Sequence, residues 1–184
     1  MIRAMRILPA LFALSLFFSG AALAAPSEED KLFAQLHDAD SPETAHPIEQ
    51  KLDGLFKVSG SPSVDLLMTR AQAALGSADS GTAKKLLDAV TRVAPNFAEG
   101  WRARAQIQAA SGDDAGAMVS LQKAVSLNPR QFEALADLGD MLEQYGDKPG
   151  ALKLYRQALT VDPQLAAASR REKALAKELE GQGI

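Results

Sequence analysis

The chain has no cysteine among its 184 residues, and it has only two histidines. Without cysteine it can form no disulfide, no thiolate nucleophile, no zinc–cysteine site and no lipid anchor on a cysteine. Both histidines, His37 and His46, precede residue 63, so the longer part of the chain has no histidine that could activate a serine. Histidine-dependent nucleophilic catalysis is therefore excluded there.

An excess of basic charge is also missing. The chain has 20 basic and 23 acidic residues, which give a net charge of −3 and argue against a nucleic-acid partner. The glycine-rich phosphate loop that ends in Gly-Lys-Ser/Thr is absent as well. Asp140 and Glu143 could in principle perform acid–base chemistry, but acids three residues apart on a helix usually belong to its surface. We therefore expect no enzyme, no cofactor and no small-molecule substrate.

Only one segment has the residue types of a metal site, namely the run from His37 to His46 with Asp38, Asp40 and Glu43. A calcium loop that began at Asp38 would need glycine at its sixth position, where Glu43 stands. Zinc could use the two histidines, but nothing fixes their geometry across a loop that contains proline. We expect a solvated polar turn here and no metal.

The first 24 residues have the composition of a secretory signal. Arg3 and Arg6 form a basic start, residues 7–18 form an apolar core, and Ala22-Leu23-Ala24 is a small-x-small cleavage site. We expect export to the periplasm with cleavage after Ala24. The alternative is an uncleaved anchor, because the apolar stretch just reaches the roughly 20 residues that a membrane span needs. Membrane contact is expected only if the signal is retained.

Three prolines, Pro95, Pro129 and Pro163, are spaced 34 residues apart. A fixed period of this length indicates a repeat array. Size-matched residues recur at the same interval in six columns: Leu67/Trp101/Leu135, Ala71/Ala105/Gly139, Ala74/Gln108/Leu142, Ala83/Ala117/Ala151, Leu87/Leu121/Tyr155 and Val90/Ala124/Ala158. The order of aromatic or Leu, small residue, small residue, aromatic or Leu, Ala and Pro resembles the tetratricopeptide family. The resemblance implies an all-α solenoid of helical hairpins that binds proteins.

The predicted organisation follows from this register. Its parts are a signal peptide (1–24), a lead-in and degenerate capping hairpin (25–62), three repeats within 63–163 (64–97, 98–131 and 132–163), and a C-terminal capping helix and tail (164–184). The first hairpin, around Phe33 and Leu52, is assigned to a cap because the end unit of an array has an uncovered apolar face. A separate functional arm is the competing interpretation.

The wider layout is similar to small exported tetratricopeptide proteins of alphaproteobacteria. The similarity rests on the alanine-rich signal, the hairpin that ends in Ser-Gly-Ser-Pro (59–62), the segment Phe97-Ala98-Glu99-Gly100-Trp101, and the terminal Gly-Gln-Gly-Ile (181–184). It implies a periplasmic interaction protein tied to upkeep of the cell envelope.

Three large side chains carry further expectations. Trp101 stands in a large column and is expected in the core. Arg70 and Arg104 fall in the column where Leu138 stands and where the family prefers an apolar residue. In one interpretation, each arginine lays its stem on the core and keeps its guanidinium in solvent. In the other, Asp88 or Glu99 pairs with one of the two arginines and fixes the angle between units.

Helical arithmetic predicts a second face on the first helix of each repeat, at the positions two before and one, five and eight after the Leu or Trp column. These positions hold Asp65, Met68, Gln72 and Leu75, then Glu99, Arg102, Gln106 and Ala109, then Glu133, Ala136, Asp140 and Glu143. Resemblance to the family implies that this face lines the concave partner-binding groove. With five acids and one base, it favours a basic or polar extended segment across the third repeat. Met68 and Gln72 stand where a clamp for a terminal carboxylate would begin, which disfavours that mode of recognition.

Taken together, the residues predict a non-enzymatic periplasmic adaptor that holds a segment of another envelope protein. A signal-anchored assembly factor or chaperone at the inner membrane is the alternative.

Overall fold

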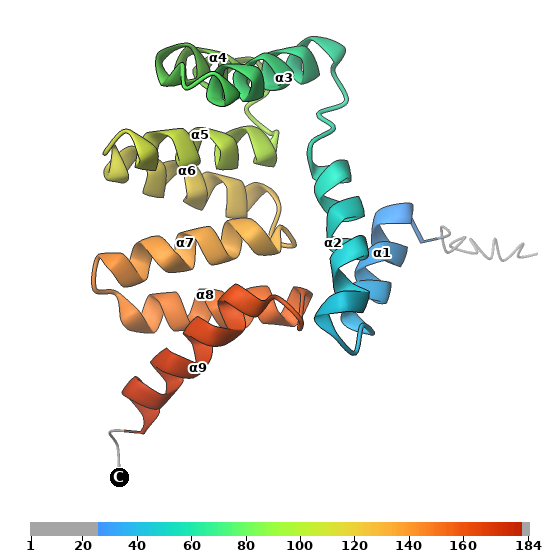
Figure 1. Cartoon of the computed structure of the whole chain (residues 1–184), viewed down its shortest axis with the longest axis vertical. Coiled ribbons are helices and arrows are strands. Elements are labelled where there is room, and N and C mark those ends of the chain that lie inside the picture. The colour runs from blue at the N-terminus through green and yellow to red at the C-terminus, as the bar shows by residue number, and fades with distance from the viewer. Residues whose placement is uncertain (1–25, 182–184) are drawn as a thin grey trace, which may run out of the picture.

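The computed structural model describes residues 26–181, so the expected signal peptide and the last three residues lie outside the described part. Within it the chain forms nine α-helices and no strand (Figure 1). Their bounds are α1 Glu28–His37, α2 Pro42–Phe56, α3 Pro62–Gly76, α4 Ser80–Val93, α5 Ala98–Ala110, α6 Asp114–Leu127, α7 Phe132–Gln144, α8 Lys148–Val161 and α9 Ala166–Glu180. None of these described helices is long and apolar enough to cross a membrane.

The second helix of each repeat begins at an aspartate. Asp79, Asp113 and Asp147 precede α4, α6 and α8, and each side chain accepts a hydrogen bond from the backbone N–H three residues later. Such a cap satisfies one of the N–H groups that a helix start leaves without a partner. The turn before two of these caps has glycine at positive φ, Gly112 at 80° and Gly146 at 86°. The starts of these helices therefore recur at the interval of 34 residues, as the prolines do.

The three hairpins α3–α4, α5–α6 and α7–α8 stack in chain order (Figure 1). The column Ala71/Ala105/Gly139 lies where the two helices of a hairpin approach closely, as Gly139 shows. A Cβ atom added to Gly139 of α7 would lie 2.8 Å from Cε1 of Tyr155 in α8, which is closer than such atoms pack. Tyr155 itself is fully buried, so its ring fills the space that the glycine leaves.

Trp101 differs from its expected place. It is only partly buried and belongs to none of the three apolar clusters of the described residues. Its indole N–H donates to the carbonyl of Pro95 at 2.9 Å, and the guanidinium of Arg104 lies 5.6 Å from the ring centroid. The polar N–H of the indole holds the ring at the surface beside that carbonyl, so the assignment of Trp101 to the core is wrong.

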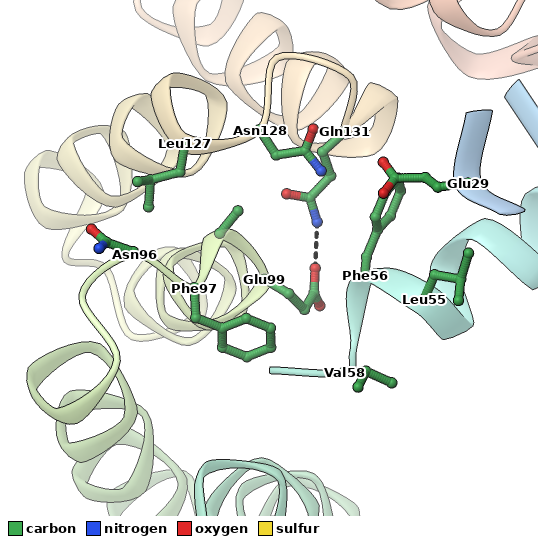
Figure 2. A pocket seen from close by; sticks show the side chains of 11 residues that line it. Glu29, Leu55, Phe56, Val58, Asn96, Phe97, Glu99, Leu127, Asn128 and Gln131 are labelled. Atoms are coloured by element: carbon green, nitrogen blue, oxygen red, sulfur yellow. Dashed lines mark hydrogen bonds between the residues drawn. The ribbon is translucent and has the colours of Figure 1, made fainter. Parts of the chain in front are cut away.

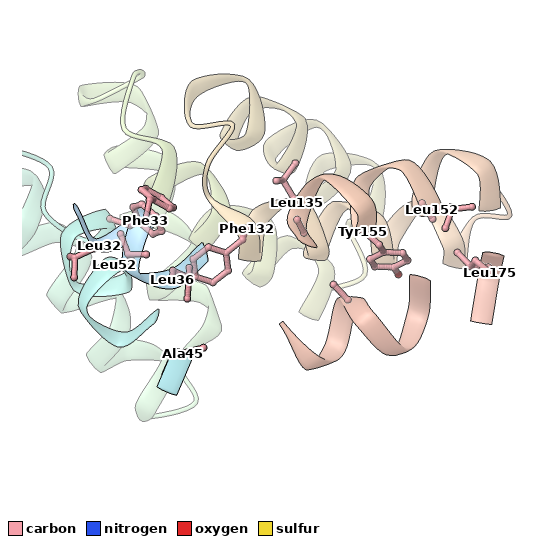
Figure 3. Packing of buried hydrophobic residues seen from close by; sticks show 14 residues of the cluster. Leu32, Phe33, Leu36, Ala45, Leu52, Phe132, Leu135, Leu152, Tyr155 and Leu175 are labelled. Atoms are coloured by element: carbon pink, nitrogen blue, oxygen red, sulfur yellow. The ribbon is translucent and has the colours of Figure 1, made fainter. Parts of the chain in front are cut away.

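The N-terminal hairpin α1–α2 exists, but it does not stack on α3 as an end cap would. It runs beside the array and contacts its far half (Figure 1). Phe56 packs between Phe33 of α1 and Phe132, the first residue of α7, with ring centroids 6.1 and 6.3 Å apart. Figure 3 shows the resulting cluster, which joins α1 and α2 to α7, α8 and α9. The apolar face of the hairpin is buried against the third repeat instead of the first.

Polar contacts hold the hairpin in the same place. Arg130, in the loop before α7, pairs with Asp30 at 2.7 Å and lies 3.7 Å from the ring centroid of Phe33. The side chain of Gln164 donates to the carbonyl of Ala39 at 3.0 Å. The segment expected as a polar turn is partly helical, because α2 already begins at Pro42, where a proline suits the first turn of a helix.

The last helix, α9, packs on α8 as expected of a C-terminal cap. Ala168 and Leu175 are buried, whereas Leu179 is 36% exposed. Arg171 is half exposed and pairs with Glu143 of α7. The cap therefore contributes a charge to the face on which the groove was predicted.

Candidate groove on the first helices of the repeats

Most of the residues predicted for the groove line one string of cavities across α3, α5 and α7. Six of them surround a cavity of 320 Å³: Met68, Gln72, Glu99, Arg102, Gln106 and Glu133. A second cavity, of 290 Å³, shares Gln106 with the first and reaches Asp140, and a third shares Asp140 and reaches Glu143. We call this string of cavities the groove. The spacing of the helical face is thus reproduced over all three repeats.

Asp65 is the exception, because it does not line these cavities. Its carboxylate accepts hydrogen bonds from the backbone N–H of Ser59 at 2.9 Å and from the Ser59 hydroxyl at 2.6 Å. These bonds lower the pKa of Asp65. It orders the link between α2 and α3 instead of facing a partner.

Arg102 is at the centre of the largest charge cluster in the groove. Its guanidinium lies 2.7 Å from Glu133 and 2.9 Å from Asp137, both on α7, and 3.7 Å from Glu99 on its own helix. Two close carboxylates satisfy much of a planar guanidinium fork. The one base predicted for the groove is therefore engaged within the chain and ties the second repeat to the third.

Glu99 is a buried acid at the start of α5. Only 6% of its surface is exposed, and it accepts a hydrogen bond from the side chain of Gln131 at 2.5 Å. Burial raises its pKa from 4.5 to about 7, the charge of Arg102 opposes this shift, and the acids Glu133 and Asp53 add to it. Glu99 thus exchanges a proton near neutral pH.

At the third repeat the acids are also engaged. The Tyr155 hydroxyl donates to Asp140 at 2.6 Å and to Glu143 at 3.1 Å, and Arg171 of α9 donates to Glu143 through its Nε at 2.9 Å. Burial and these acids raise the pKa of Tyr155, so it remains a donor. Asp140 and Glu143 are consequently structural acids as well as groove residues. Reversing their charge would break these hydrogen bonds and disturb packing, whereas the same change on a fully exposed helix face would leave stability nearly unchanged.

The two arginines in the apolar column, Arg70 and Arg104, have different surroundings. Arg104 on α5 pairs with Asp88 on α4 at 2.7 Å and donates to Ser120 on α6 at 3.0 Å, which bridges two repeats as the second alternative predicts. Arg70 on α3 is exposed, as the first alternative predicts. The difference follows from position, because Arg104 has a preceding repeat with an acid beside it.

Three contributors to the groove were missed from the sequence. Asp53 of α2 and Lys57, the residue directly after that helix, line the central cavity, and Asp137 binds Arg102. Asp137 follows Ala136 of the predicted face, so widening that face by one position would have found it. Nothing in the repeat register indicates that α2 comes to the groove, since it lies outside the periodic segment.

The segment from His37 to His46 does not bring its side chains together as metal ligands. Within residues 26–181, no group of three or more histidine or acidic side chains is placed to hold a metal ion. His46 lies beside Glu49, 3.3 Å away, and Gln50, 3.0 Å away, on the same helix.

Comparison with known proteins identifies the fold that holds this groove. No protein-family model matches the chain. A TPR repeat-containing protein of Rhizobium etli is 28% identical over 152 residues, which cover 83% of this chain and 74% of that protein. The chain has the tetratricopeptide-repeat fold.

Solved structures with the same fold match about two thirds of the chain. The first TPR of Spaghetti (RPAP3), bound to the HSP90 peptide SRMEEVD, has a TM-score of 0.59 and 17% identity over 64% of this chain and 93% of its own. The type III secretion chaperone SycD of Yersinia enterocolitica, in complex with a peptide of the translocator YopD, has a TM-score of 0.59 and 14% identity over 64% of this chain and 95% of its own. Both matches show the fold and not the partner.

Proposed function

We propose that this protein is a non-enzymatic periplasmic adaptor that binds an extended segment of a cell-envelope protein in the groove and contributes to envelope upkeep. One observation carries the proposal: the cavities on α3, α5 and α7 join end to end through Gln106 and Asp140. An elongated string of shallow cavities suits an extended chain better than a compact small molecule. Two solved structures with the same fold hold peptides, which supports the class of partner.

The charges of the groove favour a basic or polar segment. Asp53, Glu99 and Glu133 line the central cavity against Arg102 and Lys57, and Arg102 is already paired with acids of its own chain. A peptide such as SRMEEVD, with its three acidic residues, would meet this excess of acid. Electrostatic complementarity therefore favours lysine or arginine in the partner.

Crosslinking from the groove in the native cell tests the proposal. A photoreactive residue placed at Gln106, which is exposed and shared by two cavities, should trap a defined envelope protein. The same residue at Gln122 on α6, which is exposed and lines none of these cavities, is the matched control. Identical products from both positions, or none from Gln106, would contradict a groove-bound partner.

The location is a separate part of the proposal and has a separate test. Cell fractionation with mass determination of the mature N-terminus should find a released protein that begins at Ala25. A membrane-bound form that retains Arg3 would favour the signal-anchored assembly factor or chaperone instead.

A further inference from the structure

A further cavity, separate from the three that form the groove, lies beside it where the end of α2 meets two loops of the array (Figure 2). Its volume is 310 Å³. Its lining is mixed and comes from both parts of the molecule. The apolar side chains include Leu55, Phe56 and Val58 from α2 and the link after it, Phe97 from the loop before α5 and Leu127 from the end of α6, and the polar ones are Glu29, Asn96, Glu99, Asn128 and Gln131. Leu55 is 40% exposed and Val58 63% exposed, so the apolar wall continues to the surface.

The polar lining of this cavity includes two acceptor groups, the carboxamide oxygen of Gln131 and the carboxylate of Glu99, beside the carboxamides of Asn96 and Asn128. Gln131 has no exposed surface, and its Nε2 donates to Glu99. The carbonyl oxygen of the same carboxamide, Oε1, has no hydrogen-bond partner among the described residues. Figure 2 shows the Gln131 side chain pointing into the cavity toward Glu99, with Glu29 of α1 on the other side. A buried acceptor without a partner is costly, so an N–H donor that enters here is favoured.

We propose that this cavity binds a primary alkylammonium group on an apolar stem, presented either by a lysine side chain of a protein or by a free aliphatic amine. An ammonium has three donors and no acceptor, which matches the free Oε1 of Gln131 and the carboxylate of Glu99. The methylene stem lies against Leu55, Phe56 and Leu127. The site does not depend on the proposed groove function, because the groove lies on the other side of Glu99, which lines both cavities.

The charges around Glu99 give the site a pH dependence. Arg102 faces it from α5 itself, Glu133 from α7 and Asp53 from α2, while Glu29 of α1 lines the same cavity. Since the pKa of Glu99 is about 7, part of the protein holds it protonated at neutral pH. A bound ammonium favours the ionised carboxylate, so binding releases a proton. Affinity should rise up to about tenfold between pH 6 and pH 8, a range in which an alkylammonium stays charged.

Titrations of the purified protein with three small probes test the proposal. The probes are n-pentylamine, N-acetyl-lysine methylamide and N-acetyl-norleucine methylamide, and their binding is followed by NMR shifts of the backbone amides of Phe56 and Glu99, which line the cavity. We expect saturable binding of the ammonium probes in the millimolar range and none of the norleucine compound. Binding of the lysine compound assigns the site to a protein side chain, whereas binding of pentylamine alone assigns it to a free amine. No saturable binding of either would overturn the proposal.

Two pairs of variants locate the binding. Val58→Lys places a competing cation at the mouth and should weaken binding at least tenfold, whereas Val119→Lys, at a residue of 61% exposure on α6 that does not line the cavity, should not. Gln131→Met removes the free acceptor, and Gln122→Met is its exposed control. Because both valines are exposed, the first pair remains informative even if Gln131→Met does not fold. Equal binding by Val58→Lys and Val119→Lys would rule out this cavity.

Discussion

At the residue scale, Glu99 links burial to protonation. Its pKa is raised to about 7, so the folded protein binds this proton more tightly than the unfolded chain does. The resulting stability is fully present below about pH 4.5 and is lost as the pH rises through about 7. Asp162 acts in the same direction, because burial and the charge of Glu49 raise its pKa as well.

Glu99→Gln should therefore flatten the pH dependence of stability. The amide keeps the size and the hydrogen bond to Gln131 but cannot ionise. Between pH 5 and pH 8 the wild-type protein should lose up to about 3 kcal/mol of unfolding free energy through Glu99, which the variant should keep. Urea unfolding at several pH values measures this loss. Glu43→Gln, at an exposed position, is the control, and a variant with the wild-type slope would show that Glu99 is ionised throughout.

The position of Trp101 predicts an order of mutational costs in the first large column. Leu135 in the same column is 2% exposed and belongs to the main apolar cluster. Leu135→Ala should cost about 2 to 5 kcal/mol. Trp101→Ala should cost below about 2 kcal/mol, because the ring is partly exposed and loses one hydrogen bond and one cation–π contact. Denaturant unfolding of both variants gives the order, and a larger loss for Trp101→Ala would place its ring back in the core.

At the element scale, the close approach of α7 and α8 depends on Gly139. An alanine there would place its Cβ 2.8 Å from Tyr155, which is already buried and bonded to Asp140. Gly139→Ala should destabilise the protein by about 1 to 3 kcal/mol through overpacking. Gly54→Ala on α2, where no atom lies within 4 Å of the added Cβ, should instead stabilise by about 0.5 to 1 kcal/mol. Melting of both variants tests the difference, and equal effects would mean that α7 and α8 can move apart.

The elements also show what the sequence could predict. Every helix of the three repeats follows from the interval of 34, because proline, small residue and capping aspartate recur with it. Most of the groove follows too, since a helix fixes which side chains share a face. The string of cavities from Met68 to Glu143 agrees with that face.

What could not be predicted depends on contacts between distant segments without a period. The docking of α1 and α2 on the third repeat rests on pairs such as Phe56 with Phe132 and Arg130 with Asp30. Neither pair belongs to a motif, so the hairpin was expected at the wrong end of the array. The burial of Glu99 follows from the same docking, because Phe56 of α2 lines the cavity beside it. The proposed alkylammonium site could not be predicted from the sequence for the same reason.

At the scale of the whole molecule, the two ends of the array are covered unequally. The third repeat is flanked by the second repeat, by α9, and by the hairpin α1–α2. The first repeat packs through α4 on α5, and in the described part of the chain no helix stacks extensively on the outer side of α3, where Leu66 is 50% exposed. In a repeat array, each unit is stabilised by its neighbours in addition to its own contacts.

Opening should therefore begin at the first repeat. We expect native-state amide hydrogen exchange to give α3 and α4 the lowest opening free energy of the repeat helices, and α7 and α8 a value close to that of global unfolding. Destabilising the first repeat, for example with Ala83→Gly, should raise exchange in α3 and α4 and leave α7 and α8 nearly unchanged, whereas Ala151→Gly at the equivalent position of α8 should raise exchange throughout. Both alanines are fully buried, so the two variants are matched in cost. Because Met68 and Gln72 bring α3 into the groove, a bound segment that reaches the first repeat should protect α3 more than α7. Equal opening free energies in all three repeats would mean that the array unfolds as one cooperative unit and that the covering of its ends does not govern its dynamics.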